Sequence, residues 1–174
     1  SIIAVPSVEG PAVGDKVFGE NVAKALEVFL EIGKKYGFEC ENVDYRCGKV
    51  TLKTDNKKTS PYKEGFENEV GVVGHIDVVP AEASTWSCDP FSLTLRDGLL
   101  LGRGTEDDKG PLIAALYAMR YIKEELKLQL PFDVSIIAGC NEETGMKDLP
   151  YYLKKHNAPF FSVTPDASFP VCIG

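Results

Sequence analysis

The chain has 174 residues, a net charge of -7, 44% hydrophobic residues and 26% charged residues. This composition excludes the disordered and fibrous classes, and the length suits one domain built around a single core. No apolar run reaches about 18 residues and no Lys/Arg cluster stands out, so we expect neither a membrane span nor nucleic-acid binding.

The first half of the chain predicts one amphipathic helix and two strands. Apolar residues recur at helical spacing over residues 22–35, and Gly37 would end that helix. Residues 50–54 alternate between apolar and polar side chains, which predicts a half-buried strand. The Lys-rich segment 56–66 reads as a loop. The β-branched run over residues 69–75 then predicts a buried strand with a functional tip.

The second half continues the alternation of strands and helices. It predicts a hairpin over residues 91–101 that turns at Asp97-Gly98, a helix from Pro111 to Ile122, a strand over 132–138, a short helix over 148–155 and a last strand over 160–163. Such alternation indicates an α/β fold.

Polar residues follow three of these strands directly. His75, Glu142, Glu143 and Asp166 all come just after a strand end, where open α/β sheets form their sites. Three separate segments that deliver acids and a histidine to one rim are more informative than any one of them.

His75 and Asp77 are two residues apart, so in extended chain they project to the same side. A neutral imidazole can bind a metal through one nitrogen while the other nitrogen donates to a carboxylate, which fixes the tautomer. A histidine held at a strand end for structural reasons is the alternative.

The other acids also have two readings. Asp107 and Asp108 precede a helix and could cap it. Glu142 and Glu143 are adjacent, so one could bind a metal while the other acts as general base; a solvated turn is the alternative. Asp166 could be a turn or capping residue. Taken together, one histidine and several carboxylates suit zinc, manganese or cobalt.

The five cysteines (Cys40, Cys47, Cys88, Cys140 and Cys172) form no Cys-x-x-Cys pair, so a thiolate zinc site is not indicated. Their odd number and scattered positions favour reduced thiols and a cytoplasmic protein.

A wider set of motifs resembles the M20 metallopeptidases. The matching residues are His75-Ile76-Asp77-Val78-Val79-Pro80, Trp86, Asp89-Pro90-Phe91, Asp97-Gly98, Gly102-Arg103-Gly104, Asp107-Asp108-Lys109-Gly110, Glu142-Glu143 and Pro165-Asp166. The run from Thr164 to Pro170 resembles the dipeptidase V branch in particular.

This resemblance implies a zinc-exopeptidase-like mixed β-sheet flanked by helices, and hydrolysis of dipeptides by a water that bridges two divalent metal ions. His75 and Asp166 would bind one ion, Asp107 would bridge both, and Glu143 would bind the second. Asp77 would orient His75, and Glu142 would be the base. The Asp107–Asp108 peptide would be cis. A deacylase or aminoacylase of the same family, and a non-catalytic metal-binding fragment, are the alternatives.

The resemblance also implies what the chain lacks. The family's lid domain, with its catalytic histidine and arginine, and a later metal-binding histidine have no counterpart here, and His156 looks like the end of a surface helix. We therefore expect residues 1–174 to be the N-terminal portion of a catalytic domain, very weakly active alone. The face left by the missing half could allow self-association.

Overall fold

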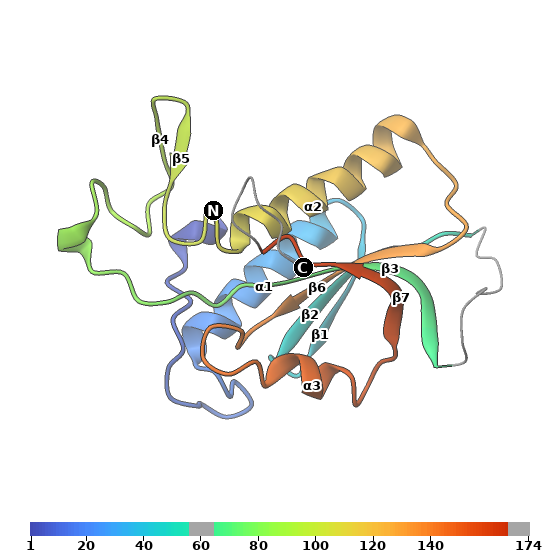
Figure 1. The fold of residues 1–174 in the computed structure, drawn as a ribbon, viewed down its shortest axis with the longest axis horizontal. Coiled ribbons are helices and arrows are strands. Elements are labelled where there is room, and N and C mark those ends of the chain that lie inside the picture. The colour runs from blue at the N-terminus through green and yellow to red at the C-terminus, as the bar shows by residue number, and fades with distance from the viewer. Residues whose placement is uncertain (56–64, 167–174) are drawn as a thin grey trace.

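The computed structural model describes residues 1–55 and 65–166. Its main feature is a five-stranded mixed sheet in the order β1-β2-β6-β3-β7 (Figure 1). The strands are β1 (Glu39–Val43), β2 (Cys47–Leu52), β3 (Phe66–His75), β6 (Asp133–Gly139) and β7 (Ala158–Val163). β3 is parallel to both β6 and β7, while β2 is antiparallel to β1 and β6. The carboxyl ends of the three parallel strands therefore meet at one rim of the sheet.

Helices cover both faces of this sheet (Figure 1). α1 (Glu20–Lys35) and α2 (Lys109–Tyr121) pack on one face, and their apolar stripes meet Ile136 and Ala138 of β6 in the main core. The short α3 (Asp148–Tyr152) covers the other face, where Tyr152 packs with Ile137. Alternate residues of β6 thus serve the two cores, as the period of a strand requires.

A two-stranded hairpin extends away from this body (Figure 1). β4 (Thr94–Arg96) and β5 (Leu99–Leu101) pair antiparallel around the predicted turn at Asp97-Gly98. Asp97 and Gly98 both have positive φ, 54° and 78°, as a tight hairpin turn requires. Three short helical turns complete the described elements: η1 (Ile2–Ala4), η2 (Ala83–Thr85) and the π-helix η3 (Ile122–Leu126), which continues α2.

The predicted α/β class is confirmed, as a mixed sheet flanked by helices. Both long helices, the hairpin and the strands at β2, β3, β6 and β7 are present, with ends that differ by a few residues. β1 was not predicted, and the helix expected over residues 148–155 ends at Tyr152. Most of the predicted loop over residues 56–66, and residues 167–170 of the dipeptidase V motif, lie outside the described residues.

Within residues 1–55 and 65–166, no helix is long and apolar enough to cross a bilayer. Four cysteines fall in these ranges (Cys40, Cys47, Cys88 and Cys140), and all four are free thiols. Burial raises the pKa of the Cys47 and Cys140 thiols, so both act as small apolar side chains rather than as nucleophiles.

Candidate metal centre

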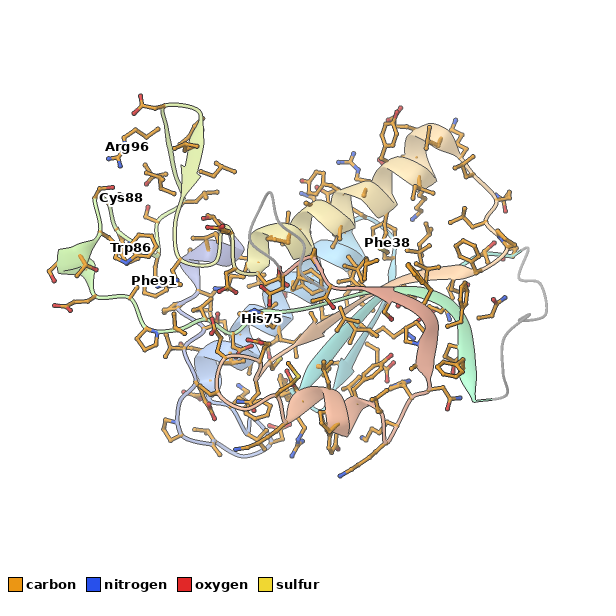
Figure 2. All side chains as sticks on the ribbon, viewed as in Figure 1. Phe38, His75, Trp86, Cys88, Phe91 and Arg96 are labelled. Atoms are coloured by element: carbon orange, nitrogen blue, oxygen red, sulfur yellow. The ribbon has the colours of Figure 1, made fainter. Side chains whose placement is uncertain are left out.

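The predicted site residues meet at the rim formed by the carboxyl ends of β3, β6 and β7. His75 is the last residue of β3, and Glu142 and Glu143 lie in the turn that follows β6. Asp166 follows β7, and Asp107 precedes α2. Figure 2 shows His75 near the base of the arm that carries Trp86, Cys88 and Arg96.

The ring of His75 is fixed by its own strand end. The side chain is 1% exposed, and its Nδ1 lies 3.0 Å from the backbone carbonyl oxygen of Asp77. The Asp77 carboxylate is further away, with Oδ1 3.4 Å from Nδ1. Because a carbonyl oxygen can only accept, Nδ1 must carry the hydrogen of this bond. The other ring nitrogen, Nε2, is then the one available to a metal ion.

Nε2 of His75 faces carboxylates from three segments. It lies 3.0 Å from Oδ1 of Asp107, 3.5 Å from Oδ2 of Asp166 and 3.8 Å from Oε2 of Glu142. None of these oxygens completes a hydrogen bond, so among the described residues this buried nitrogen has no hydrogen-bond partner. Buried polar atoms in folded proteins are nearly always bonded, and a metal ion bound at Nε2 would satisfy this one.

Two sets of possible ligands share this nitrogen. One set is His75, Glu142 and Asp166, and the other is His75, Asp107 and Glu143; within each set the ligand atoms lie within 4.8 Å of one another. The two adjacent glutamates therefore point into different sets, as their position on a turn predicted. Every residue predicted to bind metal is present in these sets.

The clustered carboxylates shift each other's proton affinity and that of the histidine. Burial lowers the pKa of His75, but the surrounding Asp77, Asp107 and Asp108 outweigh it and raise that pKa to about 10. Burial together with the neighbouring acids raises the pKa of both Glu142 and Glu143. A bound cation would relieve the repulsion between these neighbouring carboxylates.

Asp107 and Asp108 have opposite surroundings despite being neighbours. Their peptide bond is cis, and Asp107 points to His75 with half of its side chain exposed. Asp108 is fully buried and its Oδ2 accepts from the backbone N–H of His75 at 3.1 Å. Although Asp108 occupies the N-cap position of α2, its side chain makes no capping hydrogen bond to the described helix.

Close approach of Asp108 to β3 requires the glycine before His75. A Cβ built on Gly74 would lie 2.0 Å from Oδ2 of Asp108, which is far inside any permitted contact. Burial raises the pKa of the Asp108 carboxyl to about 7. Gly74 and Asp108 therefore form one packing unit behind His75.

The N-terminal segment braces the site, a contribution that sequence reasoning missed. The Nζ of Lys109, which is fully buried, donates to the carbonyl oxygen of Val5 at 2.8 Å. Ser7 Oγ donates to the carbonyl oxygen of Ile76 at 2.6 Å, and Glu9 accepts from the side-chain amide of Asn141 at 3.2 Å. Val5, Ser7 and Glu9 lie before α1 in a stretch without apolar periodicity, so no sequence pattern indicated their role.

A cavity of about 790 Å³ opens beside the carboxylates that face His75. Asp107 and Asp166 form part of its wall, together with Arg103, whose guanidinium lies 5.2 Å from the centre of the Trp86 ring.

His156, in contrast, is remote from the rim: its Nε2 pairs with Glu41 at 3.2 Å.

Comparison with known proteins points to one family. Residues 71–173 match the model of peptidase family M20/M25/M40. The "Putative dipeptidase YtjP" of Bacillus subtilis is 37% identical over 156 residues, which cover 90% of this chain and 31% of that protein. The Beta-Ala-Xaa dipeptidase of Lactobacillus delbrueckii is 33% identical over 176 residues, which cover 99% of this chain and 35% of that protein.

Solved structures agree on the fold. Human carnosine dipeptidase 1 superposes with a TM-score of 0.75 at 24% identity, over 97% of this chain and 37% of that one. The metallo-carboxypeptidase Sso-CP2 of Sulfolobus solfataricus gives 0.73 at 22% identity, over 96% and 36%. The chain spans about a third of the length of the curated relatives it matches. On the family match over most of its length, the chain belongs to peptidase family M20/M25/M40.

Proposed function

We propose that this chain carries metal-binding and proton-transfer residues of a dipeptidase that uses two divalent metal ions, zinc being the best match. The observation that carries the proposal is the buried Nε2 of His75, which lacks a hydrogen-bond partner among the described residues and which three carboxylates approach within 4 Å. The relatives named as dipeptidases support the choice of substrate.

The donor set fits such ions. One imidazole nitrogen and several carboxylate oxygens form the borderline-to-hard set that zinc, manganese and cobalt accept. His75 and Asp166 would hold one ion and Glu143 the other, and Asp107, whose Oδ1 lies 3.0 Å from Nε2 of His75, would bridge the two. When bound, the ions would lower the pKa of a water molecule and polarise the scissile carbonyl.

The chain's own residues would prepare and move protons around that chemistry. Glu142 is the proposed base: it lies at the rim beside His75, and the raised pKa of its carboxyl favours holding a proton between abstraction and delivery to the leaving amine. Asp77 is the proposed positioning residue: its carboxylate accepts the N–H groups of Glu142 and Glu143, and its backbone carbonyl fixes the His75 tautomer. The cavity beside Asp107 and Asp166 offers room for a short peptide.

Metal content decides this proposal without relying on turnover. We expect the purified chain, prepared without chelator, to retain zinc or manganese by elemental analysis, and Asp107→Ala to lose it. Glu106→Ala is the matched control, since Glu106 is the exposed acid next to Asp107 and belongs to neither ligand set. Equal metal content in wild type and Asp107→Ala would refute the proposed ligand set.

Hydrolysis separates the roles of the two glutamates. Glu142→Gln should keep the metal content of the wild type and abolish the weak dipeptide hydrolysis expected of this chain, since an amide cannot accept the proton. Glu143→Gln should lower metal content as well. Loss of metal in Glu142→Gln without loss in Glu143→Gln would exchange their roles.

A further inference from the structure

Two buried carboxylates hold the turn that carries Glu142 and Glu143 by accepting hydrogen bonds from backbone N–H groups. Glu142 N–H and Glu143 N–H donate to Oδ1 and Oδ2 of Asp77 at 3.2 and 3.1 Å. The two N–H groups before them, of Cys140 and Asn141, donate to Oδ2 of Asp148 at 2.6 and 2.7 Å. Four successive backbone N–H groups are thus fixed by two aspartates from outside the turn.

Asp148 reaches the turn from α3, on the sheet face opposite α2. It is 1% exposed, and its other oxygen, Oδ1, accepts from Leu149 N–H at 2.8 Å. Its approach to the end of β6 needs a glycine there, because a Cβ on Gly139 would lie 2.4 Å from Oδ2. His75 pairs with Gly139 across the parallel ladder, so Asp148 holds β6 at the point where the metal-facing histidine leaves β3.

The charge of Asp148 is expensive to bury and has no cation beside it. Within residues 1–55 and 65–166, no lysine, arginine or histidine forms an ion pair with it. Three backbone N–H bonds compensate for this burial. Hydrogen bonds to an ionised acceptor are about twice as strong as neutral ones, so the carboxylate fixes the strand end more firmly than an amide or hydroxyl would.

We propose that Asp148 is a positioning residue that sets where Glu142 and Glu143 point. It makes no hydrogen bond to either glutamate, and acts by fixing the two peptide units that precede them. This inference rests on the proposed function for its consequence, metal binding, but its geometric content can be measured without metal.

The test compares Asp148→Asn with Asp133→Asn in the whole chain. With its oxygen at the Oδ1 position, asparagine would turn its NH₂ group toward the N–H groups of Cys140 and Asn141, and with its oxygen at the Oδ2 position toward Leu149 N–H. In either orientation its neutral oxygen is a weaker acceptor than the carboxylate. Asp133 is the matched control: it is also 1% exposed and also accepts a backbone N–H, from Thr54 at 3.0 Å, but it begins β6 whereas Asp148 holds its end. Two readouts are taken: amide hydrogen exchange at Glu142 and Glu143, and the dissociation constant for Co²⁺.

We expect exchange at the Glu142 and Glu143 amides to accelerate at least tenfold in Asp148→Asn, although neither amide is bonded to Asp148. Co²⁺ binding should weaken at least tenfold in the same variant. Asp133→Asn should change neither readout after correction for global stability. Unchanged exchange at both glutamates in folded Asp148→Asn would overturn the inference while leaving the metal centre intact.

A wild type that binds no Co²⁺ would instead refute the proposed function, and hydrogen exchange alone would then decide the role of Asp148. If Asp148→Asn does not fold, Gly139→Ala provides the same test, because its methyl group displaces the carboxylate without removing it. Exchange at Glu142 and Glu143 as slow as in the wild type would overturn the inference there too.

Discussion

Replacing Asp77 by asparagine should weaken metal binding without removing a proposed metal ligand. Asp77 is 1% exposed and binds no metal in the proposed arrangement. Its two carboxylate oxygens accept from Glu142 and Glu143, and Oδ1 lies 3.4 Å from Nδ1 of His75. Asparagine keeps the shape and one acceptor oxygen, but its NH₂ group faces a backbone N–H.

The structure gives the size of the effect. A hydrogen bond to a charged acceptor contributes about 1.5–3 kcal/mol, and asparagine loses one of the two. For a chain of this length, each kcal/mol corresponds to about 2–4 °C, so the Tm should fall by about 3–12 °C. Loss of a group that orients ligands typically weakens metal binding by about 10–100-fold.

The assay is competition for Zn²⁺ against a chromophoric chelator, with thermal unfolding of the metal-free protein measured in parallel. Asp15→Asn serves as control, because Asp15 is an exposed aspartate that belongs to neither ligand set. Zn²⁺ affinity in Asp77→Asn within a factor of two of the wild type would refute the reasoning, since Glu142 and Glu143 would then need no support from Asp77.

Three further outcomes follow from the same geometry. Zn²⁺ at about 100 times its Kd should stabilise the chain by about 2.7 kcal/mol, raising the Tm by about 5–11 °C. EDTA should reverse this rise in Tm. A rise of the same size in Asp107→Ala would contradict the ligand set. Gly74→Ala should lower the free energy of unfolding in urea by about 1–3 kcal/mol and weaken Zn²⁺ binding, because the new methyl group displaces the Asp108 carboxylate. Gly10→Ala is the control, because a Cβ at Gly10 meets nothing within 4 Å, and it should change neither quantity. Phe29→Ala, in the fully buried core of α1, should lower the free energy of unfolding by about 3–5 kcal/mol, and a loss below 1 kcal/mol in the same measurement would contradict the assigned core.

The elements that sequence analysis located are those with a strong apolar period. α1 shows this most clearly, since Val22, Leu26 and Phe29 are fully buried on one face. β1 was missed because it is an edge strand whose residues are mostly polar: Glu39, Glu41 and Asn42 are exposed and only Val43 is buried. Because only Cys40 and Val43 pack against the two cores, this edge strand carries no regular alternation to detect.

The rim was predictable for a different reason. Parallel strands bring their carboxyl ends together, so acids that follow β3, β6 and β7 had to converge. The sequence did not indicate which buried residues position the residues of the site. Asp148 begins a short helix after a lysine and reads as an ordinary helix start, and its role depends on the approach to Gly139 across the sheet.

Burial divides the acids of the site into two kinds that the sequence cannot distinguish. Asp107, Glu142 and Asp166 are 50%, 36% and 29% exposed, whereas Asp77, Asp108 and Asp148 are each 1% exposed or less.

A carboxylate without solvent depends on protein donors, and each of these three buried aspartates accepts at least one backbone N–H bond at the end of β3 or β6, although Oδ1 of Asp108 has no hydrogen-bond partner among the described residues. An exposed carboxylate keeps lone pairs for an ion. In the proposed centre the same residue type would therefore serve as ligand or as support according to its burial, and Asp107 and Asp108 differ because one faces the open rim and the other faces Gly74.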